Sequence, residues 1–239
     1  ARDGLARWVP AIKKAGGRVF VRVNHSERLI EDAIAATQAG ADGLYVPKVC
    51  SPDVLDRLAK SLENHEKDRS PIAFVPLIED MQGLFEVRSI AKGPRVMALA
   101  CGGEDLATAM DAKPTPEVLR YPKLMIHYAA KEAGVLSLGL LRTIADFADK
   151  EALRAAVLEA RDFGFDGASC IHPSVVPILN EGFAPSPQEV AWALKVVAAN
   201  EREATAGRGA FMLDGKFIDA PIVTRAENLI RKSQKGRAS

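Results

Sequence analysis

Cysteine is scarce in this sequence of 239 residues. The three cysteines, Cys50, Cys101 and Cys170, lie far apart, and no C-x-x-C pair is present. A disulfide scaffold needs more cysteines, and a zinc site needs closely spaced cysteine or histidine ligands. The sequence therefore excludes a disulfide framework and gives no support to a zinc site. Dispersed thiols are typical of a reducing compartment, so we expect a cytoplasmic protein.

An excess of charge and long apolar runs are also missing. Thirty-two basic and 31 acidic residues leave a formal net charge of +1, unlike the basic composition of nucleic-acid-binding proteins. The longest apolar runs, such as 72–78, are far shorter than the roughly 20 residues of a membrane helix. No basic-then-apolar leader is visible. We expect neither a nucleic acid nor a membrane as a partner.

What the sequence does contain is a repeated unit, in which a short apolar run precedes an amphipathic stretch. The runs resemble buried parallel strands, and the stretches between them have helical periodicity. The pattern predicts strands over 18–24, 43–49, 72–79, 95–103, 136–142 and 167–173, and helices over 1–15, 26–39, 53–62, 81–91, 116–133 and 150–163. Repeated βα units of this kind predict an α/β fold with a parallel sheet.

Two architectures fit this repeat, an open doubly wound sheet and a closed (β/α)8 TIM barrel. The absence of a strand-linked G-x-G-x-x-G weighs against the dinucleotide-binding open sheet. Polar residues instead follow the C-terminal ends of several predicted strands: Arg22, Asn24, Lys48, Glu79, Asp105 and His172. TIM barrels assemble their active sites from several strand ends at that rim. We therefore predict a TIM barrel.

The predicted barrel has six visible strands, whereas a full barrel has eight. We expect two upstream βα units that this sequence lacks, so that residues 1–184 form a barrel domain with strands 3 to 8. After Pro185 the pattern changes to a helix over 187–205, a hairpin turning at Asp214-Gly215 and a helix over 220–233. We assign 185–239 to a C-terminal helical arm and expect it to act as a lid.

Arg22 lies within an otherwise apolar predicted strand. A buried guanidinium without an anion is costly. It therefore either binds a carboxylate or enolate oxygen at the barrel mouth, or points outward, or pairs with a structural carboxylate. Gly102 and Gly103 end the predicted strand 95–103 and are predicted to leave backbone N–H groups free to bind an anion.

Glu79 and Asp105 follow neighbouring predicted strands. Two carboxylates at adjacent strand ends can bind Mg²⁺, whose remaining ligands are water and substrate oxygens. The alternative is that Asp80, Glu104 or Asp105 cap helices and that Glu79 is a solvated loop charge. Spacing alone leaves both interpretations open.

Other polar residues have competing interpretations. Asp219, followed by Ala and Pro, has the pattern of a helix N-cap, and a chemical role would require the arm to fold over a barrel mouth. Lys48 at a strand end raises a Schiff-base aldolase as an alternative. The other histidines show no partner pattern and are predicted to lie at the surface or in loops: His25, His65 and His127.

Seven segments, taken together, resemble the citrate lyase beta-subunit-like family. This family is the malyl-CoA and citramalyl-CoA lyase branch of the HpcH/HpaI aldolase superfamily. The segments occur in the family's order and span essentially the whole chain: VRVN (21–24), DGLYVPKV (42–49), PLIED (76–80), GGEDLA (102–107), GFDGASCIHPSVV (164–176), NEGFAPSPQEV (180–190) and DGKFIDAPIV (214–223). The sequence departs from the family's pattern at Ser174, where many members have Gln, and in lacking the family's first two strands.

The resemblance implies a (β/α)8 barrel with a C-terminal arm, dependence on Mg²⁺, an acyl-CoA substrate and a homo-oligomer, a trimer or hexamer. It also implies roles for individual residues. Glu79 and Asp105 would bind the metal, and Arg22 would lie beside the reacting oxygens. Asp219 would be an acid/base from a neighbouring subunit's arm. Lys48 would belong to a motif without forming an imine. Further substrate contacts are expected from Gly102, Gly103 and Glu104, and CoA contacts from His172 and Pro173.

The predicted function is that of a Mg²⁺-dependent carbon–carbon lyase. It would cleave a short 3-hydroxyacyl-CoA, such as citramalyl-, malyl- or citryl-CoA, into acetyl-CoA and a 2-oxo acid, or form the thioester from these two compounds. Two alternatives stay open. One is a metal-dependent class II aldolase that acts on free 2-oxo acid adducts, and the other is a non-catalytic subunit of a multi-protein lyase.

Overall fold

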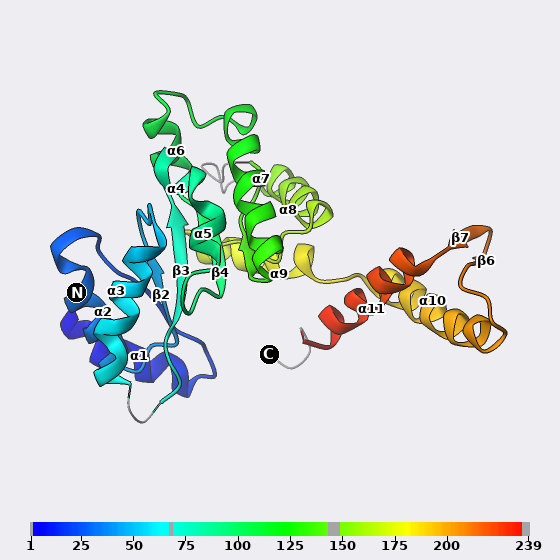
Figure 1. The fold of residues 1–239 in the computed structure, drawn as a ribbon, viewed down its shortest axis with the longest axis horizontal. Coiled ribbons are helices and arrows are strands. Elements are labelled where there is room, and N and C mark those ends of the chain that lie inside the picture. The colour runs from blue at the N-terminus through cyan, green and yellow to red at the C-terminus, as the bar shows by residue number, and fades with distance from the viewer. Residues whose placement is uncertain (1, 67–68, 143–148, 236–239) are drawn as a thin grey trace. The chain divides into compact units, whose positions relative to one another are not determined.

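The protein consists of two compact units. The computed structural model describes residues 2–66, 69–142 and 149–235. The units are Ala1–Val175 and Val176–Ser239, coloured blue to yellow-green and yellow to red in Figure 1. The change of unit thus falls nine residues before the domain boundary that the sequence placed after residue 184. The difference is the helix α9 (Val176–Phe183), which the sequence pattern did not predict.

The first unit alternates strands and helices. Its elements are α1 (Arg2–Lys14), β1 (Phe20–Arg22), α2 (Leu29–Gln38), β2 (Gly43–Val46), α3 (Pro52–Leu62), β3 (Ala73–Ile78), α4 (Met81–Phe85), α5 (Val87–Ala91), β4 (Ala98–Cys101), α6 (Gly103–Ala109), α7 (Pro116–Ala133), β5 (Leu136–Leu138) and α8 (Lys150–Phe163). The bounds of α7 and α8 are those predicted, and both helices end on a glycine with positive φ, at 73° and 95°. The helix predicted over 81–91 is divided at Glu86.

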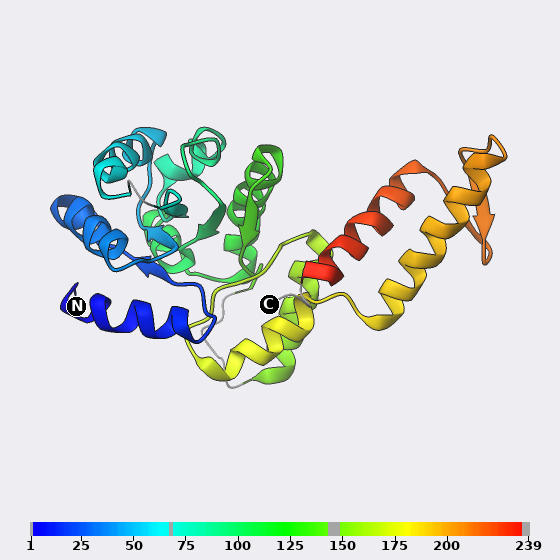
Figure 2. The same cartoon turned by 90° about the horizontal axis from the view of Figure 1, so that it is seen from below.

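The five strands form one parallel sheet in chain order, β1-β2-β3-β4-β5. Arg22 is paired with Tyr45, and Tyr45 with Val75, so the strands' carboxyl ends lie along one edge. The helices form an arc outside the strands, as Figure 2 shows. The predicted α/β fold with a parallel sheet is confirmed. The described strands leave the sheet open, and closure into a barrel stays a prediction.

The sixth predicted strand, 167–173, is not formed. Gly167 makes a single parallel bridge with Leu138, and Ile171 is 82% exposed. A strand persists where repeated backbone hydrogen bonds hold it. Within the described ranges this segment has only the end of β5 beside it, so the ladder stops after one pair.

The sheet has apolar residues on both faces. Leu44, Phe74 and Leu99 pack against the helices on the outer face, whereas Val75, Leu77, Ala98 and Ala100 form a second cluster on the inner face. Strands buried on both faces are characteristic of parallel sheets. The inner face leads to the edge at which the candidate site lies.

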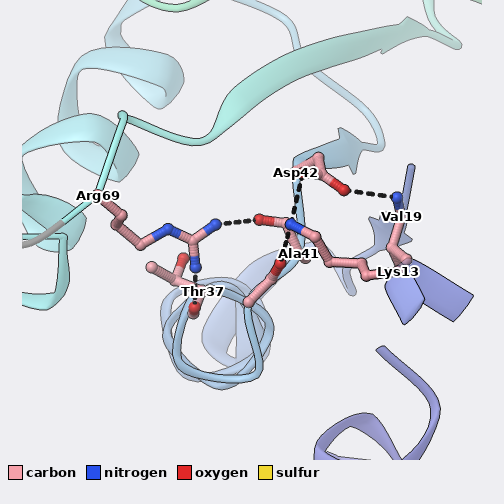
Figure 3. A network of polar contacts seen from close by, with 7 residues as sticks. Lys13, Val19, Thr37, Ala41, Asp42 and Arg69 are labelled. Carbon is pink, nitrogen blue, oxygen red and sulfur yellow. Dashed lines mark hydrogen bonds and ion pairs between the residues drawn. The ribbon is translucent and has the colours of Figure 1, made fainter. Parts of the chain in front are cut away.

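The opposite edge of the sheet is held by a polar network around the start of β2. Figure 3 shows the Arg69 guanidinium pointing at the carbonyl oxygens of Thr37 and Ala41, to which it donates hydrogen bonds. Asp42 accepts a hydrogen bond of 2.8 Å from the backbone N–H of Val19. These contacts join α2 and β1 to β2 at the amino ends of the strands. They stabilise the edge away from the site.

His127 is buried, contrary to its predicted surface position. It is 3% exposed, its ring stacks on Phe165 with centroids 4.4 Å apart, and Nδ1 lies 3.0 Å from the Ser137 hydroxyl. Burial lowers the pKa of His127, and the charge of Lys131 lowers it further. The neutral ring therefore belongs to the core between α7 and β5.

We expect His127 to make the protein less stable in mild acid. The unfolded chain binds the proton more tightly than the folded one, so stability falls as pH drops below the unfolded pKa of about 6.5. The check is thermal unfolding of the wild type and of His127→Gln at pH 7.5 and 5.5. We expect the unfolding temperature of His127→Gln to fall less between these pH values than that of the wild type. His65→Gln, at an exposed histidine, serves as the control. An unchanged decrease in His127→Gln would contradict the assignment.

The second unit has its own small core. It contains α9, α10 (Pro187–Thr205), β6 (Phe211–Leu213), β7 (Lys216–Ile218) and α11 (Ala220–Lys235). The sequence predicts α10 with these bounds, and a capping box of Ser186 and Glu189 fixes its start. The hairpin turns at Asp214 and Gly215, whose φ angles are 48° and 76°, as an Asp-Gly turn requires. In neither unit does a described helix have the length and apolarity to cross a bilayer.

Candidate active site at the carboxyl edge of the sheet

Glu79 follows β3 directly and is the most buried acidic residue of the predicted site, at 4% exposed. Its Oε2 accepts a hydrogen bond of 2.9 Å from the backbone N–H of Lys48, which follows β2. Its Oε1 lies 3.7 Å from the guanidinium of Arg22 at the end of β1. Three neighbouring strand ends thus meet at one carboxylate. The interpretation of Glu79 as a solvated loop charge is wrong.

Gly102, at the end of β4, leaves the space in which the Glu79 side chain lies. A Cβ atom on Gly102 would be 2.5 Å from Glu79 Cγ and 2.6 Å from Oε1, closer than non-bonded atoms approach. The backbone N–H of Gly102 donates to the Ile78 carbonyl at 3.0 Å. This amide is therefore not free for an anion, contrary to the prediction, because it continues the β3–β4 ladder. Gly102 instead permits a buried carboxylate to lie on the backbone.

Asp105 lies in the first turn of α6, which follows β4. Burial raises the pKa of Glu79, and the negative charge of Asp105 raises it further, although the Lys48 N–H and Arg22 act in the opposite direction. The two predicted metal ligands thus follow adjacent parallel strands, and Asp105 is near enough to act on the Glu79 carboxyl. The alternative capping role holds for Asp80, whose side chain accepts from the Gly83 N–H at 2.7 Å.

Arg22 is at the same rim, but it is not buried. Its side chain is 66% exposed, because it extends from the last residue of a short strand. Because Arg22 is exposed, there is no cost of burying its guanidinium, and an anion is not required on that ground. Of the alternatives, the chain shows an exposed arginine that also pairs with a carboxylate, and that carboxylate is one of the predicted metal ligands.

The residues at this rim fit a Mg²⁺ ion. The charge of Asp105 adds to the burial that raises the pKa of Glu79, and a bound divalent cation would compensate the negative charge that burial disfavours. No cluster of three or more His, Cys, Asp or Glu side chains suited to a metal occurs among the residues that the structure describes. Sparse carboxylate ligation, completed by water and substrate oxygens, is characteristic of Mg²⁺.

Lys48 adopts a backbone conformation that is unusual for its residue type. Its φ is 52°, in the left-handed region that glycine and asparagine occupy at lower cost. This turn ends β2 and aims the Lys48 N–H at Glu79. The sequence singled out Lys48 only as a possible imine former and as part of a family motif. A left-handed backbone conformation at a lysine cannot be recognised from the sequence, since the sequence pattern that marks such turns is a glycine or asparagine.

A pocket of about 280 Å³ lies beside the end of β4, where Cys101 lines it. Lys123 on α7 lines it and is 8% exposed, and its ammonium donates to the Arg142 carbonyl at 3.3 Å. Burial lowers the pKa of Lys123 and raises that of Cys101 to about 11, so the thiol is inert as a nucleophile. Sequence reasoning missed Lys123, since it looks like an ordinary polar position of an amphipathic helix. The pocket is also lined by Gly103, Glu104 and Cys170.

Two other predicted groups make contacts within their own segments. His172 is exposed, and its Nδ1 accepts a hydrogen bond of 3.2 Å from the Ser174 N–H at the start of the turn at Pro173. Asp219 belongs to the second unit and precedes α11, where its side chain accepts from the Ile222 N–H at 3.4 Å. The N-cap interpretation of Asp219 therefore describes its contacts. Its role toward a neighbouring subunit, and the role of His172 and Pro173 toward CoA, stay predictions.

Comparison with known proteins identifies the family. Residues 2–173 match the model of the HpcH/HpaI aldolase/citrate lyase family. The chain belongs to this family. Among its relatives, the mitochondrial citramalyl-CoA lyase of Homo sapiens is 30% identical over 88% of this chain and 66% of its own. The (3S)-malyl-CoA thioesterase of Cereibacter sphaeroides is 31% identical over 90% of this chain and 74% of its own. The family expectation drawn from the sequence motifs is confirmed.

A solved structure of the same family resembles the fold. The crystal structure of CitE from Mycobacterium tuberculosis, in complex with magnesium, acetoacetate and coenzyme A, has a TM-score of 0.72 and 26% sequence identity. The match covers 90% of this chain and 77% of that one. The chain spans 59% to 66% of the length of the rat, human and mouse citramalyl-CoA lyases.

Proposed function

We propose that this protein is a Mg²⁺-dependent lyase that cleaves, or forms, a short 3-hydroxyacyl-CoA. The products of cleavage would be acetyl-CoA and a 2-oxo acid. The observation that carries the proposal is the buried Glu79 carboxylate. It is held by the Lys48 N–H at 2.9 Å, lies 3.7 Å from Arg22 and interacts electrostatically with Asp105.

In this proposal Glu79 and Asp105 would hold the metal. When bound, Mg²⁺ supplies Lewis-acid polarisation of the substrate oxygen that becomes the ketone. Arg22 donates hydrogen bonds to the oxygens on which negative charge develops, a contribution typically worth about 3–4 kcal/mol for a well-placed donor. Cleavage breaks the bond between the hydroxyl-bearing carbon and the methylene of the thioester, while the hydroxyl loses its proton to water and its oxygen becomes the ketone oxygen. That methylene keeps the electron pair and receives a proton, which we assign to Asp219 of a neighbouring subunit.

The comparisons support this proposal at the level of the family. A relative is named as a citramalyl-CoA lyase, and the CitE structure contains magnesium, acetoacetate and coenzyme A. We further propose that the sheet closes into a (β/α)8 barrel and that the protein forms a homo-oligomer, in which Asp219 of one subunit serves the rim of another. His172 and Pro173 are proposed to contact CoA.

The test is turnover by the purified protein with Mg²⁺ and citramalyl-CoA, malyl-CoA or citryl-CoA, with acetyl-CoA and the 2-oxo acid measured by chromatography. We expect cleavage of at least one substrate and its loss on chelation with EDTA. Turnover of pyruvate and an aldehyde without CoA would instead indicate a class II aldolase. Activity that appears only with co-purified partners would indicate a non-catalytic subunit. No cleavage of any thioester under any of these conditions contradicts the proposal.

Thioester hydrolysis is a second candidate function, favoured by the relative named as a (3S)-malyl-CoA thioesterase. Hydrolysis of malyl-CoA releases free CoA and malate, whereas the lyase reaction releases acetyl-CoA. Quantifying free thiol and acetyl-CoA in the same malyl-CoA reaction separates the two. Free thiol without acetyl-CoA or a 2-oxo acid would assign the chain to the thioesterase.

A further inference from the structure

The rim carries two cations next to the proposed metal ligands. Arg22 ends β1 and Lys48 follows β2, and the backbone N–H of Lys48 donates to Glu79 Oε2 at 2.9 Å. Arg22 lies 3.7 Å from Glu79. The ammonium of Lys48 has no hydrogen bond or ion pair with any residue of the described ranges, and the residue is exposed. One of the two cations is therefore unused by the fold.

The backbone of Lys48 holds Glu79 through its N–H, and a smaller residue would make the same contact. Its N–H holds Glu79 through a turn with φ of 52°, and glycine or asparagine adopts this conformation with less strain. Strained non-glycine residues that persist in folded proteins cluster at functional sites. The lysine side chain, rather than the turn, is then the feature that needs an explanation.

Cationic side chains beside a metal site can bind an anionic ligand. With Mg²⁺ on Glu79 and Asp105, the attraction between these carboxylates and the neighbouring cations is diminished, and Arg22 and Lys48 remain as donors at the edge of the sheet. A small substrate that contributes oxygens to the metal would bring its own negative charge between them. The expected ligand chemistry is a carboxylate or a phosphate.

We propose that the Lys48 ammonium binds the carboxylate of the 2-oxo acid part of the substrate, alongside Arg22. This inference rests on the proposed function and deepens it. It assigns to Lys48 a non-covalent role in substrate binding, distinct from imine formation. It commits to the carboxylate rather than to the phosphates of CoA, since Lys48 is anchored by its own backbone to the Glu79 metal ligand.

Three variants separate the side chain from the backbone. Lys48→Ala removes the ammonium and keeps the strain that any L-residue has in this turn. Lys48→Gly removes the ammonium and relieves that strain. Lys48→Arg keeps a cation. For each full-length protein, the dissociation constants of Mg²⁺, of pyruvate at saturating Mg²⁺, and of CoA are measured by titration calorimetry, with circular dichroism confirming the fold.

We expect Lys48→Ala and Lys48→Gly to weaken pyruvate binding alike, by about tenfold or more. Lys48→Arg restores most of the affinity. CoA affinity stays unchanged, and Mg²⁺ affinity stays unchanged or increases, because a nearby positive charge has been removed. A purely structural role would weaken Mg²⁺ binding through Glu79 and would make glycine better than alanine.

Several results would overturn the inference. They are unchanged pyruvate binding in both truncated variants, a loss of CoA affinity in place of pyruvate affinity, or a loss of Mg²⁺ affinity that parallels the loss of pyruvate. Failure of the proposed function is distinguishable from these, since the wild type itself would then bind no pyruvate, with or without Mg²⁺.

Discussion

Glu79→Gln is expected to abolish Mg²⁺ binding and to lower kcat/KM by about a thousandfold or more, equivalent to about 4 kcal/mol of transition-state stabilisation. The amide keeps the size of the side chain and an oxygen that accepts from the Lys48 N–H. It loses the negative charge, which is what a hard divalent cation requires of its ligands. Calorimetric Mg²⁺ titration and steady-state kinetics on the substrate that the wild type cleaves are the measurements.

The same variant is expected to be more stable than the wild type when no Mg²⁺ is added. Burial raises the pKa of Glu79, and Asp105 raises it further. A raised carboxyl pKa means that the folded chain binds the proton more tightly than the unfolded one. The ionised carboxylate therefore destabilises the fold once pH exceeds the folded pKa. Thermal unfolding at neutral pH should show a higher Tm for Glu79→Gln, and Mg²⁺ should raise the Tm of the wild type alone.

The matched control is Glu86→Gln, an exposed glutamate on the segment that follows Glu79. It makes the same chemical change without touching the site, so its Mg²⁺ affinity, kinetics and Tm should match those of the wild type. If Glu79→Gln kept wild-type Mg²⁺ affinity while folding normally, the assignment of the metal to this rim would be refuted.

Gly102→Ala is expected to have the second-largest effect, although it changes no charged or metal-ligating group. The new methyl group would lie 2.5 Å from Glu79 Cγ and 2.6 Å from Oε1, so the carboxylate must leave its place beside the Lys48 N–H. We expect Mg²⁺ affinity and kcat/KM to fall by about a hundredfold or more. Stability should fall by about 1–3 kcal/mol, which is usual for overpacking.

Gly167→Ala is the comparison for this variant. A Cβ there would meet only Leu138 Cδ2 at 3.6 Å, an ordinary contact. The substitution adds the same methyl group in the same unit, so its Mg²⁺ affinity should equal that of the wild type. Normal Mg²⁺ binding by Gly102→Ala would show that the position of Glu79 against the backbone does not matter for the metal.

The sequence was sufficient for most of the helices and strands and for the family. Apolar periodicity predicted α7, α8 and α10 with the bounds that the structure gives them. It also predicted the parallel order of the strands. The helix bounds and the strand order both follow from local patterns that each element satisfies by itself. The position of Glu79 and Asp105 at one edge of the sheet was likewise predictable, since residues that follow adjacent parallel strands must share that edge.

Burial and backbone contacts were decided only by the tertiary structure. The exposure of Arg22, the use of the Gly102 amide by β3, the left-handed turn at Lys48 and the buried ring of His127 all depend on which distant segment lies alongside. A residue's neighbours across a sheet are separated from it by whole βα units, and its own flanking sequence does not encode their distance. For this reason the sequence determined which residues gather at the rim, whereas the packing of the strands decided which of them are buried, held or free to bind.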